Sequence, residues 1–429
     1  MIKIELLDFI KRSPSPYHAV RNVCVSLDGA GFKRLYEHDI WDIENGGKYY
    51  VVRGGSSIIA FSVPPARFCG IAVCASHTDS PSFKIKSELP PVNGLVRLNV
   101  EGYGGMAKES WFDRPLSAAG RIAVGTDKGI EYKLVDIDRD LMMIPSLAVH
   151  MGAPRENGKV NTQTELLPVL CTEETKKSFP DLLSEYAGVR IEDIEGFDIY
   201  LYNRESGTVF GADNEFIASP RIDNLESVYA SVKAFLNSEE NGMLKVLAAF
   251  NNEETGSLTR QGAESTFFAD TLDRINEALG ISRSEYLALL PSSFIMSVDN
   301  AHAAHPNYIG KADPVSRPRL NGGVVIKYNA SGRYTTDAVS AAVVKRLCKK
   351  AGVPFQEFHN RSDIAGGSTL GNLMNRHISV HSADIGLAQL AMHSAYETAG
   401  AKDVLYMERF LTEFYGTRIT SENNGLKLI

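Results

Sequence analysis

The 429-residue sequence lacks several features that mark specialised classes of protein. It has five cysteines, which are scattered and never form a Cys-x-x-Cys pair, so we expect a reduced, cytoplasmic chain without a disulfide framework. No run of about 20 apolar residues is present, so no transmembrane helix is predicted. The N-terminal residues carry charges between their apolar positions, which indicates an amphipathic helix and not a signal peptide.

The sequence also lacks a strong excess of positive or negative charge. Lys and Arg number 45 and Asp and Glu number 52, which gives a net charge of −7 without any long run of one sign. This balance argues against a general nucleic-acid-binding protein. Apolar residues make up 44% and charged residues 23% of the chain, as in ordinary globular proteins, and the length suggests about two or three domains.

The texture of the sequence changes twice along the chain. Residues 92–213 contain short alternating segments, many glycines and turn signals, which predict an inserted β-rich module. Beyond residue 219, strand and helix patterns alternate, as expected for a mostly parallel sheet with helices on both faces. We therefore expect an α/β domain made of residues 1–91 and 214–429, interrupted by the module at 92–213, with a loose tail at 421–429.

Acidic and imidazole side chains gather where apolar runs end. They are His77 and Asp79 after the run at 68–75, Glu253 and Glu254 after 244–250, Asp299 after 294–298, and His393 in the segment beyond the run at 378–380. In an open α/β sheet, ligands bind beyond the carboxyl ends of the strands. The sequence therefore predicts that these four segments converge on one site.

Imidazole and carboxylate groups without cysteine suit zinc or another borderline divalent ion, and cobalt and manganese would also be accepted. Two ions fit the residues better than one. His77 and His393 would each serve one ion, Glu254 and Asp299 would divide between them, and Asp223 could bridge the pair. Paired ions about 3.5–4 Å apart activate a bridging water in aminopeptidases.

The adjacent carboxylates Glu253 and Glu254 need different roles, because neighbouring side chains in an extended segment diverge. One would bind metal, and the other would take a proton from the water and pass it to the leaving amine. Asp79, two residues beyond His77, would accept the second ring N–H of this histidine and fix its tautomer.

The sequence resembles the M18 metallopeptidases, whose best-known members are aspartyl aminopeptidases. Six ordered blocks carry the resemblance: Arg12-Ser13-Pro14-Ser15-Pro16 with Tyr17-His18-Ala19-Val20, Ser76-His77-Thr78-Asp79-Ser80-Pro81, Ile144-Pro145-Ser146-Leu147-Ala148-Val149-His150, Asn252-Glu253-Glu254-Thr255-Gly256-Ser257, Ser297-Val298-Asp299-Asn300-Ala301-His302 through Tyr308, and Gln389-Leu390-Ala391-Met392-His393-Ser394. The resemblance implies that the metal ligands are His77, Asp223, Glu254, Asp299 and His393, with Asp223 as the bridge. It also implies that Glu253 is the general base and that Asp79 orients His77.

The resemblance further implies a zinc-exopeptidase-like catalytic domain, a dimerisation role for the inserted module, and a homododecamer built from dimers. His150 matches a histidine that family members supply to a neighbouring subunit, while Lys327 and Tyr334 match residues that help hold the substrate. His302 is a candidate pocket residue. The expected partners are peptides, with no nucleic acid and no membrane.

The predicted function is a dinuclear metal-dependent aminopeptidase that removes an N-terminal Asp or Glu through a bridging water activated by Glu253. One departure bears on the substrate: aspartyl members carry Thr-Pro-Cys-Gly-Thr-Thr where this chain has Ile364-Ala365-Gly366-Gly367-Ser368-Thr369. The alternatives are an aminopeptidase for neutral residues such as Leu, a deacylase with a similar metal centre, and a non-catalytic oligomeric peptide-binding scaffold. Intact Glu253 is hard to explain for a scaffold.

Overall fold

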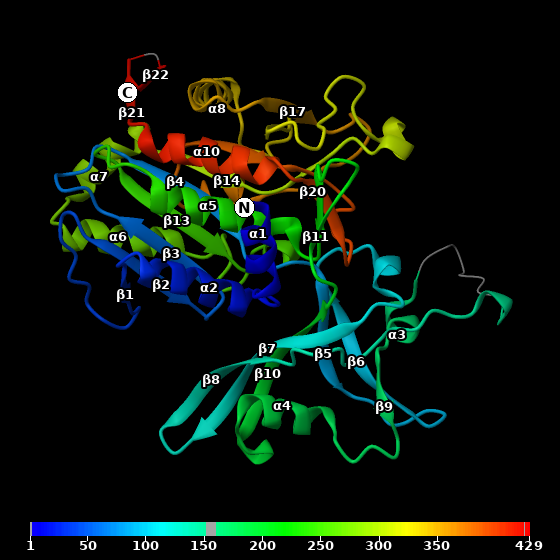
Figure 1. Ribbon diagram of the computed structural model, residues 1–429. Coiled ribbons are helices and arrows are strands. Elements are labelled where there is room, and N and C mark those ends of the chain that lie inside the picture. Colours follow the sequence, from blue (N-terminus) through cyan, green and yellow to red (C-terminus); the bar gives the residue numbers. More distant parts are fainter. Residues whose placement is uncertain (1, 152–159, 424) are drawn as a thin grey trace.

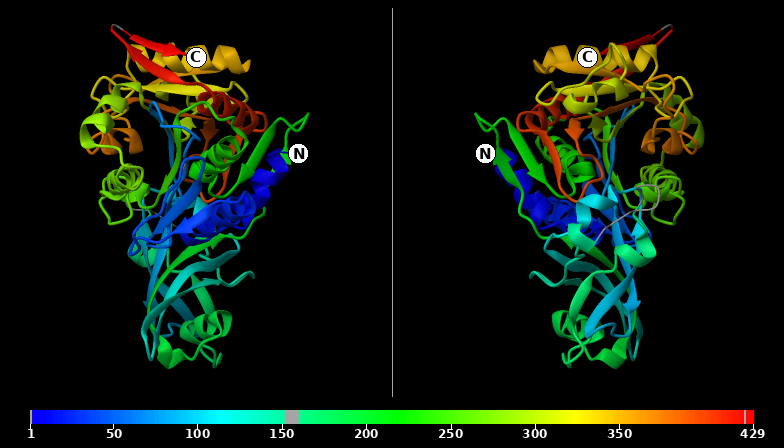
Figure 2. Two further views of the ribbon diagram at one scale, coloured as in Figure 1. Left: turned by 90° about the vertical axis from the view of Figure 1, so that its left-hand side faces the viewer. Right: turned by 90° about the vertical axis from the view of Figure 1, so that its right-hand side faces the viewer.

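The chain folds into two lobes of unequal size (Figure 1). The computed structural model describes residues 2–151, 160–423 and 425–429. In these ranges, the larger lobe is built on a nine-stranded sheet and the smaller lobe on a six-stranded sheet. Seen from the two sides, the smaller lobe extends away from one end of the larger one (Figure 2).

The nine-stranded sheet has a parallel block at its centre. Its strands, in spatial order, are β1 (Lys33–Leu35), β2 (Lys48–Arg53), β3 (Ser57–Ser62), β13 (Leu244–Phe250), β4 (Ile71–His77), β14 (Phe294–Val298), β18 (His381–Gly386), β16 (Val324–Tyr328) and β17 (Phe355–His359). The neighbours β13, β4, β14 and β18 all run parallel. Their carboxyl ends therefore meet at one edge, where an α/β sheet binds its ligand.

Helices cover both faces of this sheet, which confirms the predicted fold class. One face is covered by α1 (Ile2–Lys11), α2 (Pro16–Gly29), α5 (Ile222–Asn237), α8 (Ala338–Ala351) and α10 (Asp403–Gly416). The other face is covered by α6 (Phe267–Ala278), α7 (Arg283–Leu289) and α9 (Leu370–Met374). The predicted helices at 224–237 and 336–351 correspond to α5 and α8, to within two residues at their starts.

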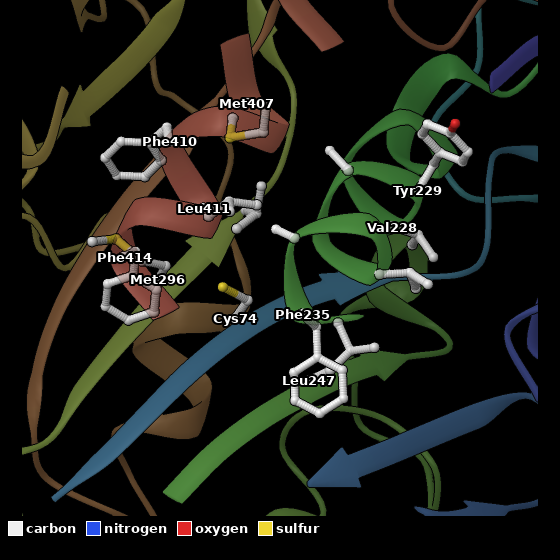
Figure 3. Packing of buried hydrophobic residues seen from close by; sticks show 14 of the residues in the cluster. Cys74, Val228, Tyr229, Phe235, Leu247, Met296, Met407, Phe410, Leu411 and Phe414 are labelled. Carbon is white, nitrogen blue, oxygen red and sulfur yellow. The ribbon is translucent and has the colours of Figure 1, made fainter. Parts of the chain in front are cut away.

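The core under α5 and α10 packs against the middle of the central strands. Figure 3 shows Phe410 and Phe414 of α10 and Phe235 of α5 beside Cys74 of β4 and Leu247 of β13. The two α10 phenylalanines are four residues apart, so they lie on the same face of the helix. Burial of each such side chain contributes about 1.5–3 kcal/mol. The central strands are therefore well anchored behind the edge that carries polar residues.

The smaller lobe is antiparallel, with the strand order β8 (Gly129–Asp136), β7 (Leu116–Thr126), β10 (Ile194–Asn203), β5 (Ser82–Glu88), β6 (Leu95–Tyr103) and β9 (Val169–Thr172). Two short helices, α3 (Thr162–Glu165) and α4 (Phe179–Ala187), accompany this sheet. The sheet begins at Ser82 and ends at Asn203, whereas the sequence pattern marked the module as 92–213. The sequence pattern did not assign β5 to the module, because this strand directly follows the motif at the end of β4.

A third, five-stranded sheet lies at the carboxyl edge of the large one, in the order β11 (Thr208–Phe210), β12 (Phe216–Ser219), β20 (Glu397–Gly400), β19 (Ala388–Leu390) and β15 (Ala301–His302). The expected loose tail is wrong, because β21 (Ile419–Glu422) and β22 (Gly425–Leu428) pair as an antiparallel hairpin. None of the helices in the described ranges is long and apolar enough to cross a membrane.

Candidate metal centre

The carboxyl edge of the parallel block gathers the predicted site residues. His77 is the last residue of β4, Glu253 and Glu254 lie in the short 3-10 helix η5 (Glu253–Thr255) after β13, and Asp299 follows β14. The run at 378–380, in contrast, is not a strand: β18 begins at His381, and His393 comes from the turn between β19 and β20. The third sheet therefore brings this histidine to the edge of the large one.

A cavity of about 240 Å³ collects these side chains. Its lining includes all five predicted metal ligands and the predicted base, namely His77, Asp223, Glu253, Glu254, Asp299 and His393. Asp223 enters from the first turn of α5, and its peptide bond to Asn224 is cis. Residues separated by more than 300 positions in the chain thus meet in one small space.

Asp223 lies between two histidines. Its Oδ1 is 3.4 Å from Nε2 of His77, and its Oδ2 is 3.5 Å from Nε2 of His393. Nε2 of His77 is also 3.3 Å from Oδ1 of Asp299, and Nε2 of His393 is 3.4 Å from Oε2 of Glu254. Three potential ligand groups result among the described residues: His77–Asp223–Asp299, Asp223–Glu254–His393 and His77–Glu253–Glu254. Asp223 belongs to the first two.

Unpartnered oxygens in the cavity fit a cation. Oδ1 of Asp223 and Oε1 of Glu254 are buried and accept no hydrogen bond among the described residues, although Nε2 of His77 lies 3.4 Å from the first of these oxygens. Burying a carboxylate oxygen without a partner is costly unless it is paired or coordinates a metal. Together with the imidazole and carboxylate donor set, these oxygens make the residues present suitable for divalent ions such as zinc.

The crowding of acidic groups raises the pKa values of the two glutamates when no cation is bound. Burial, reinforced by the charges of Asp299 and Asp79, raises the pKa of Glu253 to about 8. Burial and the Asp223 charge raise the pKa of Glu254 well above its usual range. Burial alone would lower the pKa of His77, but its contacts with Asp223 and Asp299 outweigh this effect and raise the pKa well above 6.5. A cation entering the cavity would therefore displace protons.

Asp79 is placed to do more than orient His77. Nδ1 of His77 lies 3.1 Å from the backbone oxygen of Asp79 and 3.5 Å from its Oδ1. The same carboxylate accepts hydrogen bonds from the backbone N–H groups of Glu253 and Glu254, both at 3.2 Å. Asp79 therefore connects the end of β4 with the 3-10 helix that carries the two glutamates.

Two contributors were missed by the sequence analysis. The hydroxyl of Tyr103, at the end of β6 in the smaller lobe, donates to Oδ2 of Asp79 at 2.7 Å and accepts from Nδ2 of Asn252 at 2.9 Å. Asn252 has a φ of 65°, a left-handed conformation that asparagine adopts more readily than most residues. The Asn-Glu-Glu motif could have drawn attention to Asn252, but no spacing signal points to Tyr103.

Three of the four predicted substrate residues line the cavity: His302, Lys327 and Tyr334. Lys327 is only 2% exposed, and its Nζ donates to Oδ2 of Asp299 at 3.0 Å and to the backbone oxygen of Asn300 at 3.1 Å. Its ammonium also lies 5.3 Å from the centre of the Tyr334 ring. The lysine thus contacts a predicted metal ligand as well as the space open to a substrate.

The fourth predicted residue, His150, lies elsewhere. It is exposed in the 3-10 helix η2 (Val149–Met151) of the smaller lobe and does not line the cavity. Gly367 and Ser368 do line it, so part of the divergent segment 364–369 borders the pocket.

The fold and the site define a class of protein, since histidine and carboxylate groups at the carboxyl edge of an α/β sheet are typical of metal-dependent hydrolases. Comparison with known families narrows the class. The Aminopeptidase I zinc metalloprotease (M18) family model matches residues 9–415, and the chain belongs to this family. The protein is therefore a metallo-aminopeptidase, a hydrolase that acts on peptide bonds.

Individual relatives agree with this assignment. A probable M18 family aminopeptidase 2 of Clostridium acetobutylicum is 42% identical over 422 residues, which cover 96% of this chain and 98% of the relative. A structure of a complex of Ape4 and Nbr1 superimposes with a TM-score of 0.91 at 35% identity, over 96% of this chain and 85% of that one. A yeast Ape1 dodecamer gives a TM-score of 0.85 at 28% identity, over 96% of each chain.

Proposed function

We propose that this chain is a dinuclear aminopeptidase that removes an N-terminal Asp or Glu from peptides. The observation that carries the proposal is the position of Asp223, whose two oxygens lie 3.4 and 3.5 Å from different histidines. A carboxylate with this arrangement is suited to bridge two cations. His77 and Asp299 would complete one ion site, and Glu254 and His393 the other.

When bound, two divalent ions, of which zinc is favoured and cobalt or manganese would also fit, would polarise the scissile carbonyl and lower the pKa of a water. Glu253 takes the proton of the attacking water and later delivers it to the leaving amine. Its carboxyl lines the same cavity as the predicted metal ligands, within reach of the space between them. Asp79 holds the backbone of Glu253 by a hydrogen bond of 3.2 Å, which limits movement of the base.

The preference for an acidic N-terminal residue is supported by Lys327. Among the described residues that line the cavity it is the one lysine or arginine, and an ammonium attracts a substrate carboxylate. Tyr334 and His302 would form other parts of the pocket. A neutral preference would instead point to the segment 364–369, two of whose residues border the cavity.

The proposal extends to assembly and location. We infer a homododecamer built from dimers, with the smaller lobe as the dimerisation domain, because the yeast Ape1 relative is described as a dodecamer and matches over 96% of this chain. In such an assembly, exposed His150 would reach a neighbouring subunit's cavity. The scattered cysteines, all of them free, agree with a cytoplasmic location.

The test is a set of initial rates on peptides with N-terminal Asp, Glu, Leu, Ala and N-acetyl-Asp. The protein is stripped with a chelator and refilled with zinc, cobalt or manganese, and bound metal is counted. Two ions per chain and restored cleavage of the Asp and Glu peptides alone are expected. Preference for Leu would overturn the acidic specificity, cleavage of N-acetyl-Asp would favour a deacylase, and full activity with one ion would overturn the dinuclear site.

A further inference from the structure

A buried carboxylate outside the predicted ligand set contacts two of its members. Glu397, the first residue of β20, is 2% exposed. Its Oε2 accepts a hydrogen bond from the backbone N–H of Asp223 at 3.0 Å, and its Oε1 accepts one from the backbone N–H of His393 at 2.7 Å. A single side chain therefore joins the start of α5 to the turn between β19 and β20.

Both partners belong to the same potential ion site. Asp223 and His393, together with Glu254, form one of the two ligand groups that share Asp223, and Glu397 is bonded to the other of these groups through Asp223. His393 has a φ of 64°, a left-handed conformation that is unfavourable for a residue with a Cβ. The short hydrogen bond to Glu397 stabilises this turn and so directs the imidazole into the cavity.

A second layer of polar groups fixes Glu397 itself. Nε2 of Gln389 lies 3.4 Å from Oε1 of Glu397, and Nδ2 of Asn300 donates to Oε1 of Gln389 at 2.8 Å. Gln389 and Asn300 are both buried. The N–H groups of Asp223, His393 and Gln389 therefore all lie against oxygens of Glu397, and Asn300 in turn holds Gln389.

The arrangement parallels that of Asp79. Asp79 accepts the backbone N–H groups of Glu253 and Glu254, and Glu397 accepts those of Asp223 and His393. Each carboxylate thus holds two site residues by their main chain. This pairing leaves the side chains of the four residues available to face the cavity.

We propose that Glu397 is a positioning residue for the ion held by Asp223, Glu254 and His393, an inference that rests on the proposed dinuclear function. It binds no ion and no substrate itself. It sets the distance between the carboxylate of Asp223 and the imidazole of His393 by holding both backbones. Outer hydrogen-bond partners of this kind typically change metal affinity by about 10–100-fold when they are replaced.

The substitution Glu397→Gln tests this role with little change in volume. Its amide has one acceptor oxygen and one NH₂ donor, so only one of the two backbone N–H groups keeps its acceptor and the other faces a donor. We expect the ion at Asp223, Glu254 and His393 to bind about 10–100-fold more weakly, and the other ion, which shares only Asp223 with it, to be weakened less. With both ions at saturating concentration, kcat should fall while KM changes little.

Asp403→Asn is a matched control. Asp403, at the start of α10, is fully buried and also accepts two backbone N–H groups, from Asn321 at 2.6 Å and Gly323 at 2.9 Å. These partners do not line the cavity. The control therefore measures what neutralising a buried, doubly bonded carboxylate does to the protein as a whole.

The experiment titrates cobalt(II) into chelator-stripped wild type, Glu397→Gln and Asp403→Asn, following the cobalt absorption bands and competition with a chelator. The inference is supported if Glu397→Gln, and not Asp403→Asn, weakens one ion more than the other and alters its absorption bands. It is overturned if both ions bind Glu397→Gln as tightly as wild type with unchanged bands, or if both variants lose affinity equally. A wild type that binds only one ion defeats the dinuclear function, and the affinity of that ion in Glu397→Gln still decides the role of Glu397.

A measurement on the wild type covers the case in which the variant does not fold. Backbone amide exchange is followed by mass spectrometry in metal-free enzyme, on overlapping peptides that isolate the amide of His393. Slow exchange at this amide supports the hydrogen bond to Glu397 as a feature present before any ion binds. Unprotected exchange there overturns the inference.

Discussion

Tyr103 and Asp79 lie in different lobes, and the tyrosine hydroxyl donates a hydrogen bond of 2.7 Å to Oδ2 of the aspartate. Tyr103 ends β6 of the smaller lobe, and Asp79 follows β4 of the large sheet. Because Asp79 also accepts the backbone N–H groups of Glu253 and Glu254, the smaller lobe contributes to the position of the predicted base. The smaller lobe therefore supports the site as well as any assembly that it mediates.

Replacing Tyr103 by Phe tests this contribution. The ring would keep its edge-on contact with Tyr200, but Asp79 would lose a donor and Asn252 an acceptor. We expect kcat to fall about tenfold, equivalent to about 1.4 kcal/mol, because a hydrogen bond to a charged group is removed. Steady-state kinetics would measure this change. Tyr132→Phe on exposed β8 is the control and should leave kcat unchanged; equal rates for both variants would contradict the role of Tyr103.

The two adjacent glutamates are expected to differ when each is changed to Gln. Glu253→Gln should lower kcat by about 10²–10⁴-fold, because a general base is removed, and should keep both ions. In Glu254→Gln the primary effect should be weaker metal binding, since Oε2 of Glu254 lies 3.4 Å from Nε2 of the predicted ligand His393. Metal content by atomic emission and initial rates on the same preparations separate the two effects. A Glu253→Gln protein with wild-type rate would remove the base assignment.

Much of the large lobe could be predicted from sequence because its central strands are buried on both faces. Such strands appear as continuous apolar runs, and the predicted segments 244–250 and 294–298 coincide with β13 and β14. The polar residues directly after them were expected to meet, and His77, Glu254 and Asp299 line one cavity. A simple physical rule about parallel strands was sufficient for this part.

The rest of the fold and of the site depends on contacts between distant residues, which the hydrophobic periodicity of the sequence does not indicate. β18 was missed because it contains the polar residues Ser382 and Asp384, and the apolar run that suggested a strand lies just before it. Glu397 and Tyr103 act through hydrogen bonds to residues distant in sequence, and their types are common on surfaces. The spacing of His393 and Glu397 gave no indication that the side chain of Glu397 would accept the backbone N–H of His393.

Lys327→Met tests whether the buried ammonium serves the substrate, the metal site or both. Its Nζ donates a hydrogen bond to Oδ2 of Asp299 at 3.0 Å, so the variant should bind metal more weakly. The resulting loss of activity should be the same for every substrate. If the ammonium also binds an acidic side chain, kcat/KM for an Asp peptide should fall about tenfold more than for a Leu peptide, which equals about 1.4 kcal/mol of selective binding. Kinetics at saturating metal isolates the second effect. Equal losses on the two peptides would assign Lys327 to Asp299 alone.

The metal-free protein should lose stability as pH rises through neutrality. The folded-state pKa values of Glu253 and Glu397 are raised to about 8, mainly by burial, and that of His77 is raised well above 6.5 by its carboxylate partners against the effect of burial. Each group binds protons more tightly in the folded than in the unfolded chain. The free energy of unfolding therefore decreases with pH from about 4.5, the usual glutamate value, to about 8.

Thermal unfolding of chelator-stripped and zinc-loaded protein at pH 5.5, 7 and 8.5 measures this dependence. The stripped protein should have its lowest Tm at pH 8.5. The loaded protein should change less, because cations replace the protons at Glu254 and the histidines. Stripped Glu253→Gln should show a shallower dependence than stripped wild type, since one titrating group with a raised pKa is gone. A stripped wild type whose Tm rises with pH would show that the cavity carboxylates do not hold protons in the folded state.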